Sequence, residues 1–306
     1  MKLSIVVSAR NDDYGGNFLH RFQASVNALA SLAARHSLDA ELIVVEWNPP
    51  AAPRLKQALA WPAFPTRILT VPNEIHRRIE GSDRMPIFEY VAKNAGIRRS
   101  TSDFVLATNA DIIFSGELVQ LLTQKLDDRA YYRAHRHDVR GLVPVEAPID
   151  EQLAFCRAHV FRATEFKGGK FRFSRARKVA GGEIGILRAL NYKKAYTDGS
   201  GDFLLMARSR WEAMRGYPEF LSHGTIDSYG VELASYLGMS QIIFEHPIYH
   251  QDHDRGQTSG RPVASWKEEL IGKRNEESKW GLPGVELEAW SNAGCENRSG
   301  CPGNFY

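Results

Sequence analysis

The sequence predicts an α/β protein with a mostly parallel central sheet flanked by helices. Short apolar runs rich in β-branched residues alternate with longer segments in which apolar residues recur every three or four positions. The runs are apolar throughout, as in strands that helices cover on both sides of a parallel sheet. With 306 residues, 43% of them hydrophobic, the chain is long enough for one large core.

The first half of the chain carries the clearest pattern. Strands are expected at residues 3–8, 42–45, 67–71 and 103–108. The segment from Phe18 to Ala33 has one apolar face and predicts a helix capped by Asn17, and residues 87–98 predict another. Ser115 can cap a third helix. Ligands bind beyond the carboxyl ends of parallel strands, so we expect binding loops at residues 9–13, 46–48 and 109–111.

From about residue 130 the alternation weakens. Residues 157–194 form a basic stretch with only Glu165 and Glu183 as acids, which suits either an anionic ligand or a solvated loop. Order returns with an expected strand at 202–207, helices at 209–215 and 227–237, and a strand at 241–244. We expect one domain at residues 1–260, with halves at 1–115 and 116–260, and an extension at 261–306 packed against it.

Composition and charge exclude several classes of protein. The net charge of +3 and pI near 8.7 are ordinary, and no arginine-rich motif predicts nucleic-acid binding. The apolar run at the N-terminus is short for a signal peptide, and no window reaches the roughly 18 apolar residues of a membrane span. A cytoplasmic location with reduced cysteines is therefore expected. A peripheral membrane contact stays open, although no amphipathic helix favours it.

Asn109 and Asp111 follow the fourth expected strand, two positions apart. In an extended segment, side chains at i and i+2 point the same way, so the amide oxygen and the carboxylate can face one ion. Oxygen ligands of this kind suit Mg²⁺ or Mn²⁺ bound to a diphosphate. Asn and Asp also favour ordinary turns, which is the alternative interpretation.

A histidine cluster follows the last expected strand, at His246, His250 and His253. Histidine is a common metal ligand, and such clusters are uncommon by chance. A polar, solvated loop is the alternative. A separate zinc site is disfavoured, because no cysteine lies nearby and the spacing is not that of a zinc finger.

Lys93-Asn94-Ala95-Gly96-Ile97, then a strand, then Asn109 and Asp111, resembles the order of motifs in family 2 GT-A glycosyltransferases. The opening run to Asn11, Glu46 after the second strand, and residues 201–220 fit the same family, so that the resemblance covers roughly residues 1–250. It implies a GT-A fold and a divalent-metal-dependent transfer of sugar from a UDP- or GDP-sugar to a hydroxyl of a glycan or small-molecule acceptor.

The resemblance also implies roles for individual residues. It places the donor nucleotide on Ala9, Arg10, Asn11, Glu46, Lys93, Asn94 and Asn109. It places Mn²⁺ or Mg²⁺ on Asn109, Asp111 and His250, with His253 as the alternative histidine. Asp227 would be the catalytic base if configuration inverts, with Glu232 in reserve, although Asp227 is also a natural helix cap.

The sequence departs from the family at two positions, since Asn109 replaces an acid and Gly201-Asp202 replaces a Gly-Gly pair. One alternative is therefore a degenerate GT-A domain that binds nucleotide or glycan without turnover. Another is a sugar-phosphate nucleotidyltransferase, which needs a glycine-rich basic loop after the first strand. A nicotinamide-binding domain needs Gly-x-Gly-x-x-Gly where residues 8–13 read SARNDD. The donor sugar, base, acceptor, stereochemistry and oligomeric state stay open.

Overall fold

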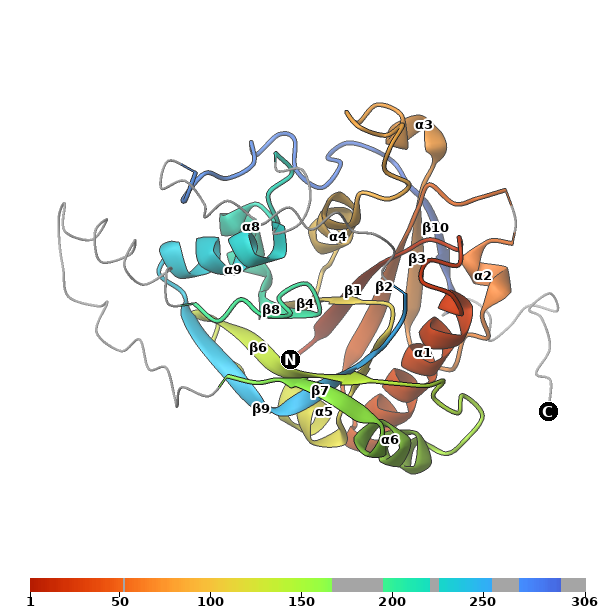
Figure 1. Cartoon of the computed structure of the whole chain (residues 1–306). Helices are drawn as coiled ribbons and strands as arrows, with labels where there is room; N and C mark the ends of the chain where they lie inside the picture. Colours follow the sequence, from red (N-terminus) through yellow and green to blue (C-terminus); the bar gives the residue numbers. More distant parts are fainter. Residues whose placement is uncertain (52, 167–194, 221–225, 255–269, 293–306) are drawn as a thin grey trace.

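A computed structural model describes residues 1–51, 53–166, 195–220, 226–254 and 270–292. These residues form a ten-stranded mixed sheet with helices on both faces (Figure 1). The strand order is β10-β3-β2-β1-β4-β8-β6-β9-β5, and β7 pairs with β6 beside this path. The expected α/β class is confirmed.

The strands and helices have the following bounds. The strands are β1 (Leu3–Ala9), β2 (Ala40–Trp47), β3 (Thr66–Val71), β4 (Phe104–Asn109), β5 (Ile112–Phe114), β6 (Ala130–Val139), β7 (Val160–Thr164), β8 (Phe203–Ala207), β9 (Ser240–Gln251) and β10 (Glu288–Ser291). The helices are α1 (Phe18–His36), α2 (Leu55–Ala58), α3 (Asn73–His76), α4 (Glu89–Arg98), α5 (Gly116–Leu122), α6 (Ile149–Ala158), α8 (Arg208–Met214) and α9 (Ile226–Tyr236).

The sheet is parallel in its first half and mixed in its second. Strands β3, β2, β1 and β4 are parallel neighbours, so their carboxyl ends meet at one edge. Strand β8 runs antiparallel to β4 and β6, and β5 runs antiparallel to β9. The edge formed by the carboxyl ends is where an α/β sheet binds ligands.

Alternation along the buried strands divides the core between the two faces of the sheet. In β1, Ile5 and Val7 pack into the cluster that contains α1 and α5, whereas Val6 packs into the cluster that contains α4, α8 and α9. Figure 1 shows these two groups of helices on opposite sides of the sheet. Both faces are apolar because both are covered, which explains why the strands read as continuous apolar runs.

Several elements differ from expectation. Strand β9 runs on to Gln251 rather than ending at residue 244, because its second half continues to pair with β6 and β5. Asn17 precedes α1 but makes no side-chain cap; instead Asp13 Oδ1 accepts the Phe18 N–H at 3.0 Å. Ser115 does cap α5, accepting from Leu118 N–H.

Residues 270–292 pack against α4 and the edge of the sheet. Arg99 donates to the carbonyl oxygens of Gly281, Leu282 and Val285, and Trp280 is buried against the α4 side of the sheet. Strand β10 then pairs antiparallel with β3. The expected boundary at residue 260, the basic residues 167–194, and Cys295 and Cys301 lie outside the described residues.

Cys156 is a buried thiol on α6, and burial raises its pKa to about 12. Among the described residues, no helix combines the length and the apolar character needed to cross a bilayer.

Gly96 lies where α4 crosses the sheet closely. A Cβ there would stand 2.5 Å from Val6 Cγ1 and 3.1 Å from Val45 Cγ2. We expect Gly96→Ala to lower the free energy of unfolding, because overpacking costs about 1–3 kcal/mol and outweighs the gain in helix propensity of about 1 kcal/mol. Urea denaturation measures the change. Gly116→Ala is the control, since its nearest neighbour would be 3.7 Å away; an equal effect in both variants would contradict close packing at Gly96.

Candidate metal and ligand site

A carboxylate and two imidazoles meet just beyond the carboxyl end of β4. Asp111 lies between β4 and β5, and the pairing of β5 with β9 sets Ile112 opposite His250. His253 follows two residues after the end of β9. One ligand atom from each of Asp111, His250 and His253 lies within 4.8 Å of the others, an arrangement able to hold a metal ion.

The geometry of this group leaves room for a cation. Asp111 Oδ2 lies 3.2 Å from His253 Nε2 and 3.8 Å from His250 Nε2. Asp111 Oδ1 is buried and has no hydrogen-bond partner among the described residues. A buried carboxylate oxygen without a donor is costly. The Asp111 carboxylate, with a second oxygen that is close to both ring nitrogens, therefore fits a bound divalent ion.

The positive charges around Asp111 favour the ionised form of its carboxylate. Burial acts to raise the pKa of Asp111, but the hydrogen bond from His253 and the charges of His250, His253 and Arg21 outweigh it and hold the pKa at about 2. The hydrogen bond to Asp111 raises the pKa of His253 above its usual value. The carboxylate is therefore an anion throughout the physiological range, as a metal ligand must be.

Arg21, which was not predicted from the sequence, holds the loop after β1 next to Asp111. Its guanidinium donates to the carbonyl oxygens of Tyr14 and Gly16, and its Nε lies 3.9 Å from Asp111 Oδ2. A Cβ on Gly15 would come within 2.4 Å of His253 Nδ1, so only glycine lets the loop lie this close. The loop and Arg21 together hold His253 toward Asp111.

Asn109 faces a different set of partners. Its Oδ1 accepts from Lys93 Nζ at 2.5 Å, and its Nδ2 donates to Asp202 Oδ1 at 2.8 Å. Lys93 is fully buried and also bonds Glu89 and the carbonyl oxygen of Gly201. Both ends of the Asn109 amide are thus engaged, and the oxygen faces the ammonium group of Lys93.

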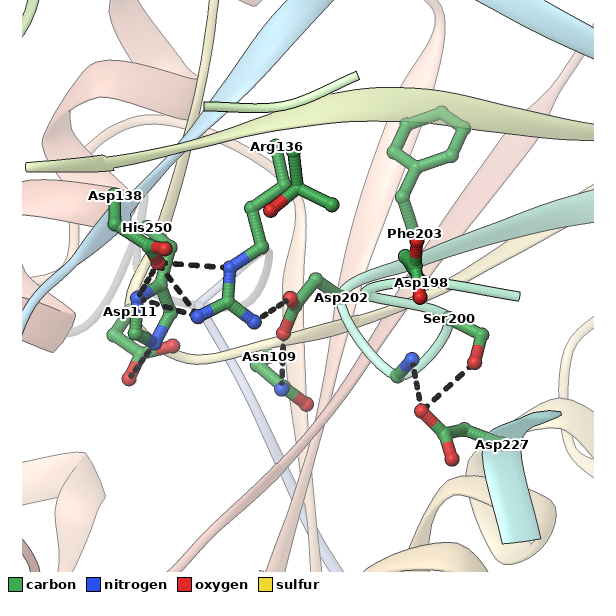
Figure 2. Close-up of polar contacts among 12 residues, drawn as sticks. Asn109, Asp111, Arg136, Asp138, Asp198, Ser200, Asp202, Phe203, Asp227 and His250 are labelled. Atoms are coloured by element: carbon green, nitrogen blue, oxygen red, sulfur yellow. Dashed lines mark hydrogen bonds and ion pairs between the residues drawn. The ribbon is translucent and has the colours of Figure 1, made fainter. Parts of the chain in front are cut away.

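Arg136 and Asp138 were not predicted from the sequence. They connect the two halves of the site, which are the group around His250 and the network around Asp202 (Figure 2). Arg136 Nη1 lies 2.5 Å from Asp202 Oδ2, and Arg136 Nη2 lies 2.6 Å from Asp138 Oδ1. Asp138 Oδ1 in turn lies 2.9 Å from His250 Nδ1. The two residues are i and i+2 on β6, so they share one face of the strand; that spacing was the available signal.

The negative charge of Asp138 is compensated by positively charged neighbours in this network. Burial acts to raise the pKa of Asp138, but hydrogen bonds and charges from His250 and Arg136 bring it to about 2. Arg162 on β7 also approaches, with Nε at 3.9 Å from Asp138 Oδ2. Asp138 is therefore a buried anion held between two guanidinium groups and an imidazole.

Asp227 lies in the first turn of α9 and points at the loop before β8. Its Oδ2 accepts from Ser200 Oγ at 2.8 Å and from Gly201 N–H at 2.9 Å. Glu232 lies five residues further along the same helix, about 140° around the axis, so the two carboxylates do not face one point. Glu232 Oε2 is buried and finds no hydrogen-bond partner in the described parts of the chain, and burial raises the pKa of this carboxyl to about 7.

The remaining residues assigned to the donor nucleotide divide into two kinds. Ala9 and Arg10 lie at the carboxyl end of β1, where Arg10 Nε donates to the Asn48 carbonyl oxygen and Asn11 Nδ2 donates to that of Pro53. Glu46 and Asn94 are buried instead. Glu46 accepts from Arg54 Nε and Leu55 N–H, and Asn94 bonds the Tyr217 backbone and Glu219. Arg10 and Asn11 are the members of the set nearest solvent.

A cleft opens beyond the ends of β2 and β3. Its volume is about 630 Å³, and its lining consists of Asn48, Asn73, His76, Arg77, Ser82, Asp83, Arg84, Met85 and Pro86. His76 is already satisfied, because Trp47 Nε1 donates to its Nδ1 and its Nε2 contacts the Ser82 carbonyl oxygen. The cleft is therefore lined by side-chain amides, backbone atoms and two arginines. It lies on the same edge of the sheet as the metal group, which consists of Asp111, His250 and His253.

Solved structures of glycosyltransferases resemble this chain at low identity. S. aureus TarS 1-349 matches with a TM-score of 0.45 and 13% identity, over 82% of this chain and 60% of that chain. The Pyrobaculum calidifontis mannosyltransferase PcManGT, solved with GDP-Man and Mn²⁺, matches with a TM-score of 0.44 and 14% identity, over 83% and 58%. The Drosophila β1,4-galactosyltransferase 7 catalytic domain, with xylobiose, gives 0.43 and 13%, over 93% and 84%.

This chain spans about 60% of the first and second of these structures. With TM-scores below 0.5, the matches carry no information on activity or ligand. No protein-family model and no curated protein matches the chain.

Asn109→Asp tests the place of this residue in the Lys93–Asp202 network. The change removes the donor to Asp202 and sets two carboxylates at about hydrogen-bond distance, so we expect the free energy of unfolding without metal to fall by about 1–3 kcal/mol. Adding Asp202→Asn restores a donor and acceptor pair and should recover part of the loss in a double-mutant cycle. Tighter Mn²⁺ binding by Asn109→Asp would instead favour Asn109 as a metal ligand.

Glu232 predicts a pH-dependent loss of stability. Its pKa in the folded state, about 7, lies above that in the unfolded chain, so its protonation stabilises the fold at low pH. That contribution is lost as pH rises through 7. Glu232→Gln cannot ionise and should gain in melting temperature relative to the parent chain, by a few degrees, between pH 5 and pH 8. The exposed Glu286→Gln serves as control, and parallel curves for Glu232→Gln and the parent would contradict the assignment.

Proposed function

We propose that the protein is a nucleotide-sugar-dependent glycosyltransferase that uses a divalent metal ion. The observation that carries the proposal is the group of Asp111, His250 and His253, with a buried carboxylate oxygen that lacks a donor, at the ligand-binding edge of the sheet. On the same edge, beyond the ends of β2 and β3, a cleft offers a binding site for the nucleotide. The order of motifs in the sequence supports the GT-A assignment independently.

The ligand set favours Mn²⁺ over Mg²⁺. Two imidazole nitrogens and one carboxylate suit a transition metal, whereas Mg²⁺ prefers oxygen ligands alone. When bound, the ion neutralises negative charge that develops on the departing diphosphate. Asp111 supplies the anion to the ion, and His250 and His253 supply neutral nitrogens.

The geometry of the edge supports a nucleoside diphosphate between the cleft and the metal group. The cleft lies at the ends of β2 and β3, and Asp111 lies at the end of β4, with β1 between them. Neighbouring strands are about 4.8 Å apart, so the separation is about 10–14 Å, comparable to the length of a nucleoside diphosphate. Arg10, at the end of β1 and paired with Asp12, would contact the phosphates between them.

The acceptor would enter on the side of α9 and the loop before β8. Asp227 Oδ2 is held by Ser200 and Gly201, which leaves Oδ1 to accept a proton from a hydroxyl if the reaction inverts configuration. Lys93 and Arg133 fix the same loop, because Lys93 donates to the Gly201 carbonyl oxygen and Arg133 to those of Tyr196, Asp198 and Phe203. A rigid loop keeps Asp227 in one orientation.

Asp111→Ala should abolish Mn²⁺-dependent release of UDP or GDP from a nucleotide sugar, because the ion loses its one carboxylate ligand. It should also remove the rise in melting temperature that Mn²⁺ with UDP or GDP gives the parent chain. Asp111→Asn, of the same shape, is the second variant, and circular dichroism checks the fold.

Asp150→Asn, which removes a surface ion pair with Arg35, serves as the control and should behave like the parent. Unchanged nucleotide release in both Asp111 variants would remove the metal group from the proposal. Tight nucleotide binding by the parent, with no release from any donor, would instead identify a non-catalytic binding domain.

A further inference from the structure

Asp138 lies behind His250 on the neighbouring strand, away from the proposed ion. The parallel pairing of β6 with β9 sets Asp138 opposite His250. The Asp138 side chain is 1% exposed, and its Oδ1 is 2.9 Å from His250 Nδ1. On the other side of the ring, His250 Nε2 faces Asp111 at 3.8 Å. The imidazole thus stands between two carboxylates, one on each ring nitrogen (Figure 2).

We propose that Asp138 is a positioning residue that holds His250 as the Nδ1–H tautomer, so that the Nε2 lone pair points at the metal position beside Asp111. The inference rests on the proposed metal site. Asp138 would touch neither ion nor substrate; it acts through His250.

The chemistry of neutral imidazole supports this role. One ring nitrogen carries the proton and the other carries the lone pair, and the hydrogen bond of the first decides which is which. A carboxylate can only accept, so Asp138 Oδ1 at 2.9 Å selects the proton on Nδ1. Metal-bound histidines commonly donate their second N–H to a carboxylate in this way, which also fixes the ring plane.

Arg136 is the group that could select the opposite tautomer. Its Nη2 lies 3.1 Å from His250 Nδ1 and could donate to a lone pair there. However, Arg136 Nη2 and Nε already donate to Asp138 Oδ1, at 2.6 and 2.9 Å, and Nη1 donates to Asp202. Each of the three guanidinium nitrogens thus already donates to a carboxylate, so Arg136 does not depend on a lone pair of His250.

The opposite tautomer would also leave the second ring nitrogen unsatisfied. A proton on His250 Nε2 would find Asp111 Oδ2 at 3.8 Å, beyond hydrogen-bond reach. The Nδ1–H form satisfies one short contact and leaves Nε2 for an ion. Arg136 then has a separate task, which is to compensate the buried charge of Asp138.

The test reads the tautomer directly in the metal-free full-length chain. Histidine labelled with ¹⁵N distinguishes Nδ1–H from Nε2–H by NMR at pH 8, and loss of one signal in His250→Gln assigns the residue. We expect Nδ1–H in the parent chain. In Asp138→Ala, Arg136 can donate to Nδ1, so we expect His250 to change to Nε2–H.

The second measurement is the affinity for Mn²⁺ alone, by calorimetry. We expect Asp138→Ala to weaken it about 10–100-fold, as loss of a hydrogen-bonded partner of a metal ligand does. Asp138→Asn keeps the shape of the side chain and should also weaken binding, because its amide can present a donor to Nδ1. Asp150→Asn should leave both tautomer and affinity unchanged.

An Nε2–H tautomer in the parent chain would overturn the inference, as would Asp138 variants that bind Mn²⁺ as tightly as the parent. The proposed function fails by a different result. A parent chain that shows Nδ1–H and binds Mn²⁺, yet releases no nucleotide from any donor, would keep Asp138 in its role and exclude the transferase.

Discussion

The pairing of β9 with both β5 and β6 is the constraint on which the site depends. Strand β5 fixes His250 beside Asp111, and β6 fixes Asp138 behind the same ring. The three residues are far apart in the sequence, and none of the three side chains would be held without the strand beside it. Since backbone hydrogen bonds determine this register, the positions of His250 and Asp138 are fixed by the sheet itself, as a preorganised site requires.

A continuous run of charged and polar contacts connects His250 to the loop before β8. It passes from His250 through Asp138 and Arg136 to Asp202, and from there through Asn109 to Lys93 and the Gly201 loop. Each buried charge has a partner of opposite sign or a polar contact, which offsets the cost of removing it from water. The two halves of the site are therefore held in one fixed arrangement.

The neutral side chain of Asn109 is explained by this run. An amide can accept from Lys93 and donate to Asp202 at once, whereas a carboxylate could only accept and would repel Asp202. In exchange, the metal group has one acid rather than two. With the two histidines beside Asp111, the group offers three candidate ligands, a set that suits a transition metal.

The sequence by itself determined the α/β class, the four parallel strands and the position of Asp111 just after a strand, because apolar periodicity and strand ends are local features. The expectation that His250 follows the last strand was wrong, because His250 lies within β9 and pairs with β5. It could not determine that β9 continues past residue 244, that Lys93 reaches Asn109, or that Arg136 and Asp138 belong to the site. Those facts depend on which strands become neighbours and in what register. Register follows from the packing of the whole sheet, so only the tertiary structure decided them.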